Sequence, residues 1–261
     1  MKQLPFNIHQ LHLEDILNQL HPSALFFEDD YTLLIVRLPT FIEEFKVISY
    51  PFIIHKEQNY FYDREKEKFI SLGINFQSFY KYLDSYVDKV VDMLFEAHEN
   101  IEICEENFHI SKTKNFLQEW HNQKKEILYI HRLLVQSSRV MNRFISAYEE
   151  DDRFLYSEFN DILEHLERSE RSAQSALSKL DQIYSFYSIT TSEKTNKSIF
   201  YLTIISAIFL PLNLIVGYFG MNTGGLFFAE HSHGTLIVTS AMLSLAFVLS
   251  IFGYKYLKNK R

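Results

Sequence analysis

The chain has a single cysteine, Cys104, among 261 residues, and it is short of basic side chains in its first three quarters. One cysteine excludes an intramolecular disulfide and any paired-cysteine metal or redox motif. Residues 1–198 hold 22 Lys and Arg against 32 Asp and Glu, a balance of −10. This acidity argues against nucleic acid and anionic lipid as partners, because both reward clustered basic side chains. It is compatible with binding cations.

Recognisable catalytic motifs are also missing from the sequence. It contains no nucleophile elbow, no phosphate-binding P-loop, no HExxH zinc motif and no dinucleotide fingerprint. We therefore predict that the protein is not an enzyme. We expect no organic cofactor.

Glycine and proline are scarce in the middle of the chain: from Ile74 to Val216 there is no glycine and only Pro211. This predicts a largely helical middle. A stripe of apolar residues at spacings of three and four runs through Phe76, Phe79, Leu83, Val87, Val90 and Leu94. A second helix is predicted from about Lys112 to Tyr148. The stripe and the apolar face of this second helix are both expected to pack into the core.

The first 72 residues have a different pattern and predict a small α/β layer. Helical spacing is present over Ile8–Leu20. Short runs rich in aromatic and β-branched residues then alternate with turn residues, and Pro51 predicts an edge or a bulge in its strand. The predicted strands are Ala24–Glu28, Thr32–Leu38, Val47–His55 and Asn59–Asp63. The front of the chain is thus predicted to be an α+β domain.

Two long uncharged segments near the carboxyl terminus exclude a wholly soluble protein. Ile199–Tyr218 and Thr235–Tyr254 are each about 30 Å long as helices, which matches the hydrocarbon thickness of a bilayer. Lysines lie before the first segment and after the second, whereas residues 219–234 contain no Lys or Arg. By the positive-inside rule both termini are cytoplasmic. No signal peptide precedes the acidic body, so we predict a multi-pass protein of the cell inner membrane.

From about Leu155 the chain can continue as one helix into the first membrane span. Apolar and small residues recur at spacings of three and four, namely Ile162, Leu166, Ser169, Ala173, Ala176, Leu180, Tyr184 and Tyr187. A stalk of this length is expected to exceed what its own domain can cover, which predicts packing against other copies of the chain. The acidic run at 149–152 is interpreted as a solvated turn rather than a metal site.

The first span carries one polar face. At 100° per residue, one side of the helix collects Asn196, Ile199, Leu202, Thr203, Ser206, Leu210, Asn213 and Gly217. Uncharged polar groups in a bilayer must face protein or water. Several copies around an axis would enclose a pore with polar and apolar rings. A polar seam between helices without conduction is the alternative.

The end of this span resembles a known family. Six of the seven glycines fall at or after Gly217, and the span ends in Gly217-Tyr218-Phe219-Gly220-Met221-Asn222. Together with Asn196-Lys197 and Phe209-Leu210-Pro211-Leu212, this stretch is similar to the stalk end, pore helix and GMN signature of the CorA divalent-cation transporters. The specific match covers Asn196–Asn222.

The resemblance implies a homopentameric funnel that transports divalent cations, with Mg²⁺ first and Co²⁺ or Ni²⁺ as further candidates. It implies that Gly220, Met221 and Asn222 form the selectivity filter and that Asn213 forms a polar ring below it. Leu210, Leu202 and Ile199 would form the constriction, and Asn196 the inner mouth. Phe219 stands where the family usually has Tyr and Asn213 where Thr is common, which leaves fine selectivity open.

Further metal contacts are predicted outside the pore. The stretch Phe159-Asn160-Asp161-Ile162-Leu163-Glu164-His165 resembles one in which the family's Asp holds regulatory Mg²⁺ between subunits, which implies this role for Asp161; a solvated carboxylate is the alternative. Glu230 concentrates cations near the mouth or is an ordinary interfacial charge. The Gly224-Gly225 pair after the GMN signature and the His233-Gly234 pair before the second span resemble the ZntB branch of the superfamily, which implies Zn²⁺. His231 and His233 would then contact the metal, or they are solvated loop residues.

The sequence therefore divides into six parts. They are a cytoplasmic α/β domain at 1–150, a stalk at 151–198, a pore-lining span at 199–218, an external loop at 219–234, a second span at 235–254 and a basic cytoplasmic tail at 255–261. A membrane-anchored interaction or sensor protein is the competing class, but it gives no reason for the GMN signature or the polar face.

Overall fold

The structure is a computed structural model of the chain, and it describes residues 6–41, 45–110, 116–221 and 232–259. The chain divides into two compact units, Met1–Ser185 and Phe186–Arg261. Each unit is described by itself.

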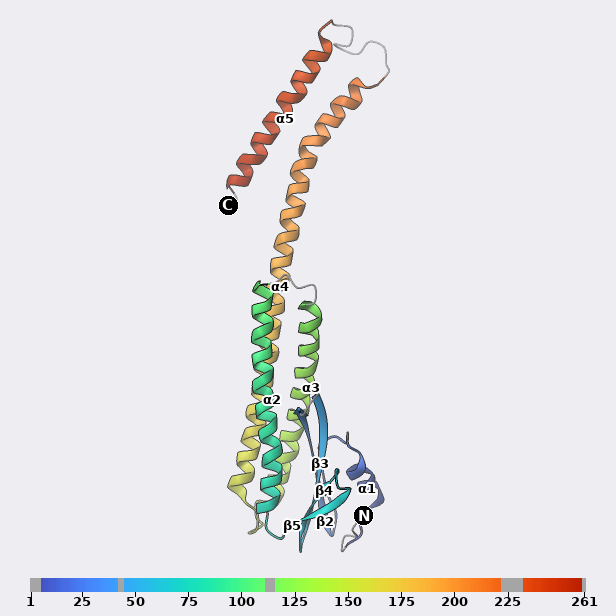
Figure 1. Ribbon diagram of the computed structural model, residues 1–261, viewed down its shortest axis with the longest axis vertical. Coiled ribbons are helices and arrows are strands. Elements are labelled where there is room, and N and C mark those ends of the chain that lie inside the picture. Colours follow the sequence, from blue (N-terminus) through green and yellow to red (C-terminus); the bar gives the residue numbers. More distant parts are fainter. Residues whose placement is uncertain (1–5, 42–44, 111–115, 222–231, 260–261) are drawn as a thin grey trace. The chain divides into compact units, whose positions relative to one another are not determined.

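The first unit contains a five-stranded antiparallel sheet whose strands follow one another in chain order. The strands are β1 (Ala24–Phe27), β2 (Tyr31–Phe41), β3 (Phe45–His55), β4 (Asn59–Asp63) and β5 (Lys68–Gly73) (Figure 1). The four predicted strands are confirmed. The fifth was not predicted; its two buried residues, Phe69 and Leu72, are three apart and do not show the alternation of a strand. It ends at Gly73, whose φ of 84° favours glycine.

Pro51 lies inside β3, at a place where this strand has a neighbour on one side only. It is opposite Ile35 of β2, whereas the pairing of β3 with β4 covers only Phe52–Ile54. Proline is tolerated where a ladder does not need its missing N–H. The edge strand or bulge predicted for Pro51 is wrong, because β3 is the central strand of the sheet and Pro51 lies just before its segment paired with β4.

The sheet separates two apolar layers. On one face, helix α1 (Gln10–Leu17) contributes Ile16 to a core that includes Leu33, Ile35 and Ile53. The opposite face packs against helix α2 (Gln77–Ile110), where the rings of Phe52 and Phe79 lie 4.4 Å apart. Figure 1 shows α2 and α3 (Phe116–Tyr148) side by side. The alternation of side chains along each strand produces this two-sided burial.

The predicted apolar stripe of α2 is confirmed. All of its residues are buried: Phe76, Phe79, Leu83, Val87, Val90 and Leu94. The first residues of this stripe, at the start of α2, meet the first turn of helix α4 (Tyr156–Phe219) in an aromatic cluster. The Phe79 and Phe159 rings are 5.3 Å apart, and Phe154 stacks on Phe159 at 4.7 Å. Burying rings of this size stabilises the packed helices by roughly 2 kcal/mol each.

The stripe predicted to pack against other copies is covered within the single chain over its first part, whereas Tyr184 near its end is 41% exposed. Its packing against other copies stays a prediction. Within a single chain the structure already buries Ile162, Leu166, Ser169, Ala173, Ala176 and Leu180. The covering surface comes from α2 and α3, which at 34 and 33 residues are each about 50 Å long. Both helices were predicted, but their apolar faces were expected to contribute only to the core of a small domain.

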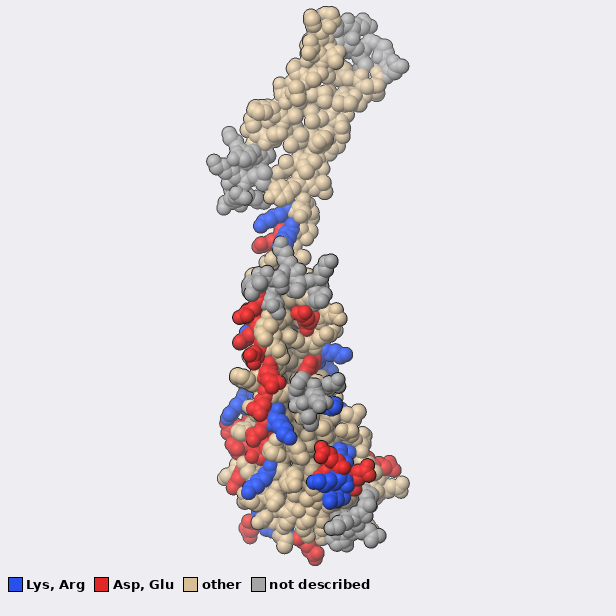
Figure 2. Space-filling model, in the orientation of Figure 1, with Lys and Arg blue, Asp and Glu red and all other residues tan. Residues whose placement is uncertain are grey.

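The second unit contains the carboxyl-terminal part of α4 and helix α5 (Gly234–Asn259). Among the described residues, two helices are long and apolar enough to cross a membrane, and their apolar 18-residue windows have mean hydropathies of 2.3 in α4 and 2.0 in residues 234–251. Their apolar windows are almost entirely exposed in the single chain. On the face in Figure 2 the charged side chains gather over the first unit, and the apolar stretches carry none.

Candidate functional site

The predicted polar face of α4 is exposed along its whole length. Asn196, Ile199, Leu202, Thr203, Leu210, Asn213 and Gly217 are exposed, and Ser206 is half-buried. Exposure alone does not distinguish this face, because Leu214 on another side is 74% exposed and Leu210 on this side 68%. The polar side chains distinguish it. Among the residues that the structure describes, the Asn213 amide makes no hydrogen bond.

Two features of this helix concern its backbone. The Thr203 hydroxyl donates to the Ile199 carbonyl oxygen at 2.9 Å, so its proton is already used within the helix. Pro211 lies inside α4 and removes the N–H that the Ala207 carbonyl would otherwise accept. Such a freed carbonyl is tolerated in a span where neighbours or water compensate.

Gly220 ends the helix at a place where a side chain does not fit. Its N–H donates to the Val216 carbonyl oxygen at 2.8 Å, and an added Cβ would lie 2.9 Å from that same oxygen. At Gly217 an added Cβ would meet nothing within 4 Å. The glycine of the GMN signature is therefore required by backbone packing, whereas Gly217 is a gap on the polar face. Met221 follows and is exposed.

Of the other residues predicted in the external segment, the structure describes only His233. Asn222, Glu230 and His231 lie outside the described residues. His233 is exposed, and its backbone carbonyl accepts the Ile237 N–H at 3.1 Å in the first turn of α5.

A cluster of side chains that could bind a cation is present in the first unit. It joins Asp84 of α2 with Asp161 and His165 of α4, and one ligand atom from each lies within 4.8 Å of the others. His165 Nε2 is 3.7 Å from an Asp161 oxygen, and His165 Nδ1 is 3.9 Å from an Asp88 oxygen. Two carboxylates and one imidazole form a mixed ligand set that suits several divalent cations.

The charges of this cluster are not fully compensated. Burial, and then the neighbouring Asp88 carboxylate, raise the pKa of Asp84 above its ordinary value. Burial and the charge of Asp84 likewise raise the pKa of Tyr80. Within the described part of the chain, His165 Nδ1 is buried without a hydrogen-bond partner. A bound cation would relieve the repulsion between the carboxylates.

The sequence analysis named Asp161 but missed two of its neighbours as ligands. The spacing of four between Asp161 and His165 places them on one helix face, and this signal was available. Asp84 was not accessible in this way, because its approach depends on how α2 and α4 align along their lengths.

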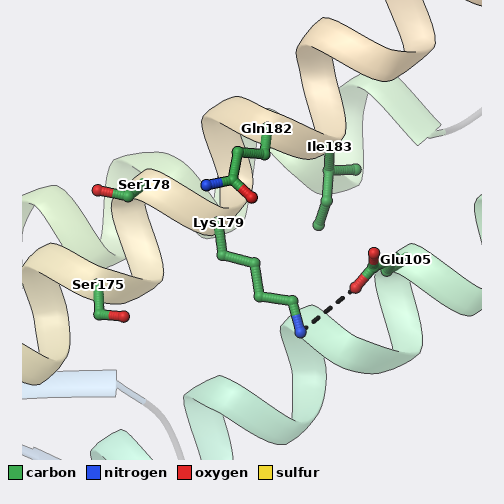
Figure 3. A pocket seen from close by; sticks show the side chains of 6 residues that line it. All are labelled: Glu105, Ser175, Ser178, Lys179, Gln182 and Ile183. Atoms are coloured by element: carbon green, nitrogen blue, oxygen red, sulfur yellow. Dashed lines mark ion pairs between the residues drawn. The ribbon is translucent and has the colours of Figure 1, made fainter.

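A cavity of about 340 Å³ between α2 and α4 differs from the Asp84, Asp161 and His165 cluster in its charges. Figure 3 shows Lys179 extending from α4 toward Glu105 of α2, at 3.3 Å between Nζ and the carboxylate. The same ammonium lies 3.5 Å from Glu102. Because the Lys179 ammonium already provides the positive charge here, we interpret the cavity as the place where ion pairs join two helices and not as a cation site.

Comparison with known proteins assigns the fold to a family. The family described as CorA-like Mg²⁺ transporter protein matches residues 52–254, which include both apolar helices and the Asp84, Asp161 and His165 cluster. The chain belongs to this CorA-like family. It is therefore a membrane-embedded divalent cation transporter, and the family is one of transporters rather than enzymes.

Individual relatives agree with this assignment. The cobalt/magnesium transport protein CorA of Thermotoga maritima is 24% identical over 270 residues, covering 95% of this chain and 76% of its own. The solved CorA magnesium transporter of Methanocaldococcus jannaschii superposes with a TM-score of 0.76 at 16% identity, over 94% of this chain and 82% of that one. The CorA fold predicted from the sequence is confirmed.

The ZntB branch is also represented among the similar structures. The cytoplasmic domain of ZntB from Vibrio parahaemolyticus has a TM-score of 0.53 at 11% identity, over 72% of this chain and 80% of that domain. At this identity the likeness concerns the fold alone.

Proposed function

We propose that the chain carries Mg²⁺ across the cell inner membrane through a pore made by five copies. The observation that carries this proposal is the polar face of α4, where the Asn213 amide is exposed and unpartnered among the described residues. An amide in a bilayer must face protein or water. Copies arranged around an axis supply both.

The pore residues follow the helix from its external end toward the cytoplasm. Neutral oxygens suit Mg²⁺, which gives up its water reluctantly and is held through its hydration shell. In this proposal Asn222, with Gly220 and Met221, forms the selectivity filter, and Asn213 forms the next polar ring. The remaining pore-lining residues are Leu210, Ser206, Thr203, Leu202, Ile199 and Asn196, with Gly217 between the two amide rings.

The orientation rests on charge. Lys194 and Lys197 precede the first span and Lys255 follows the second, while the connection lacks Lys and Arg. This pattern supports two cytoplasmic termini. The acidic first unit, with the Asp84, Asp161 and His165 cluster, then faces the cytoplasm and is available to sense the internal cation.

Regulation is proposed at that cluster. A cation that binds one conformation of the stalk more tightly shifts the population toward it, and only by that difference in affinity. We assign this role to Asp161, together with Asp84 and His165, and take the closed state as the favoured one.

The test is uptake by purified protein in liposomes. Mg²⁺, Zn²⁺, Co²⁺ and Ni²⁺ are offered separately, with and without a pH gradient. Mg²⁺ uptake that does not require a proton gradient supports the proposal. A native mass of the detergent-solubilised protein equal to five chains supports the assembly, whereas a stable monomer or dimer contradicts the pore.

Zn²⁺ transport is the second candidate, favoured by the histidines near the external mouth and by the ZntB-like fold of the first unit. Imidazole prefers transition metals to Mg²⁺. Replacing His231 and His233 by Gln separates the two. We expect transport of every ion to stay nearly unchanged, and a selective collapse of Zn²⁺ uptake would move the protein to the zinc branch. Glu230→Gln tests in the same assay whether that acid concentrates cations at the mouth.

A further inference from the structure

A second cavity, between α3 and α4, has no part in the proposed transport. Its volume is about 340 Å³, within the range of small-molecule sites. Helix α3 contributes Val135, Ser138, Arg139 and Asn142, and α4 contributes Glu167, Glu170 and Arg171. We call this cavity the α3–α4 groove.

Several polar groups of the groove are unsatisfied. Ser138 is only 7% exposed, and its hydroxyl oxygen is buried without a hydrogen-bond partner. A buried hydroxyl left unpaired costs about 1–3 kcal/mol. Among the described residues, Arg139 and Glu170 form no ion pair. Arg171 has one with Glu167, at 3.7 Å across one helical turn.

The charges decide what kind of ligand the groove attracts. Two guanidinium groups and two carboxylates line it, so their formal charges cancel. A bare anion is attracted by Arg139 and repelled by Glu170 to a similar extent, and a bare cation meets the reverse. A ligand that carries both signs of charge at separate places gains at both ends.

The donor types narrow the ligand further. Guanidinium groups hold phosphate oxygens through paired hydrogen bonds, and the Ser138 hydroxyl and the Asn142 amide add two neutral donors beside Arg139. The two glutamates are spaced by three on α4 and suit a hydrated divalent cation. We propose that the groove binds a diphosphate group together with the divalent cation that it chelates.

The experiment is calorimetric titration of the full detergent-solubilised chain with inorganic diphosphate. Mg²⁺ is kept constant and saturating in both solutions, so that the Asp84, Asp161 and His165 cluster does not contribute heat. We expect saturable binding that weakens about tenfold in Arg139→Gln and about fivefold in Ser138→Ala. Arg132→Gln, on the same face of α3 two turns away and outside the groove, is the matched control and should bind as wild type does.

A reversal of sign tests the paired ligand. Glu170→Gln should weaken binding when Mg²⁺ is present, because it removes a contact to the cation. With a chelator in place of Mg²⁺, the same substitution should strengthen binding of bare diphosphate, because it removes a repulsion. Repeating the titration with Mg²⁺ and ADP distinguishes the sources: tighter binding indicates a nucleotide and weaker binding inorganic diphosphate, and both support the groove.

Three results would overturn this proposal. They are no heat of binding in wild type, equal losses in Arg139→Gln and Arg132→Gln, and affinities that do not depend on Mg²⁺. Circular dichroism of each variant checks that its helices are intact. Since no transport is measured, failure here leaves the proposed pore unaffected.

Discussion

The indole N–H of Trp120, near the start of α3, donates a hydrogen bond to the Leu180 carbonyl oxygen of α4 at 2.8 Å. The same ring stacks on Tyr184 with 4.6 Å between centroids. The Lys124 ammonium lies 5.1 Å from the Trp120 centroid and also pairs with Asp181. Three kinds of contact thus fasten α3 to the end of the first unit.

Replacing Trp120 by Phe should keep the stacking on Tyr184 and remove the hydrogen bond to Leu180. The expected loss is about 1 kcal/mol, seen as a lower thermal midpoint of the purified protein. Phe116→Leu, one turn earlier on the same helix, changes packing without touching that bond and serves as a comparison. A midpoint equal to wild type in Trp120→Phe would show that the bond contributes nothing.

Asn222→Ala should abolish selective uptake of Mg²⁺ while leaving the assembly intact. The amide is proposed to contact the hydrated cation, and a methyl group offers no oxygen. Uptake in liposomes and native mass measure the two effects separately. Asn259→Ala, beyond the second apolar segment, is the control for loss of an asparagine. Wild-type flux and selectivity in Asn222→Ala would remove the filter assignment.

Asp84→Asn and Asp161→Asn should each weaken the protection that Mg²⁺ gives against protease, and should raise flux at high internal Mg²⁺. Each removes one carboxylate from a cluster whose ligand atoms lie within 4.8 Å of one another. Asp92→Asn, on an exposed position of α2, should behave as wild type. Unchanged protection in both cluster variants would mean that these acids are simply solvated.

Asp151 provides a prediction about pH. Hydrogen bonds from the Arg153 guanidinium hold the pKa of this carboxyl below its ordinary value. A lowered pKa stabilises the fold above the unfolded-state value near 3.9, and this contribution is lost as pH falls through the folded pKa. Asp151→Asn should therefore lower the free energy of unfolding at pH 7 by an amount on the order of 1 kcal/mol after allowance for solvent exposure. This loss is seen as a lower thermal midpoint. The two midpoints should converge in acid, and a constant difference at every pH would contradict the linkage.

The sequence predicted those features that depend on a local period. The strand Asn59–Asp63 follows from a run of aromatic residues between turn residues, and the α2 stripe from Phe76 to Leu94 from spacings of three and four. The strand Lys68–Gly73 was missed because it contains Ser71 and follows a run of charged residues at 63–68, so its apolar signal is weak.

Features that depend on two helices meeting were not predictable in the same way. The stripe of α4 was assigned to other copies, because nothing in the sequence states that α2 and α3 extend along it. Asp84 joins Asp161 for the same reason, since a difference of one helical turn in alignment would separate them by about 5 Å. The α3–α4 groove likewise depends on Arg139 of α3 and Glu170 of α4 lining the same cavity.

Three hydroxyls of α5 donate to backbone carbonyl oxygens of their own helix: Thr239 to Thr235, Ser240 to Ile237 and Ser244 to Ser240. Each proton is used, so these side chains need no donor or acceptor from lipid or from a neighbouring helix. The requirement on these three positions is one of bulk and hydropathy alone. Alanine or valine should therefore replace these three residues with little effect on the stability of the helix.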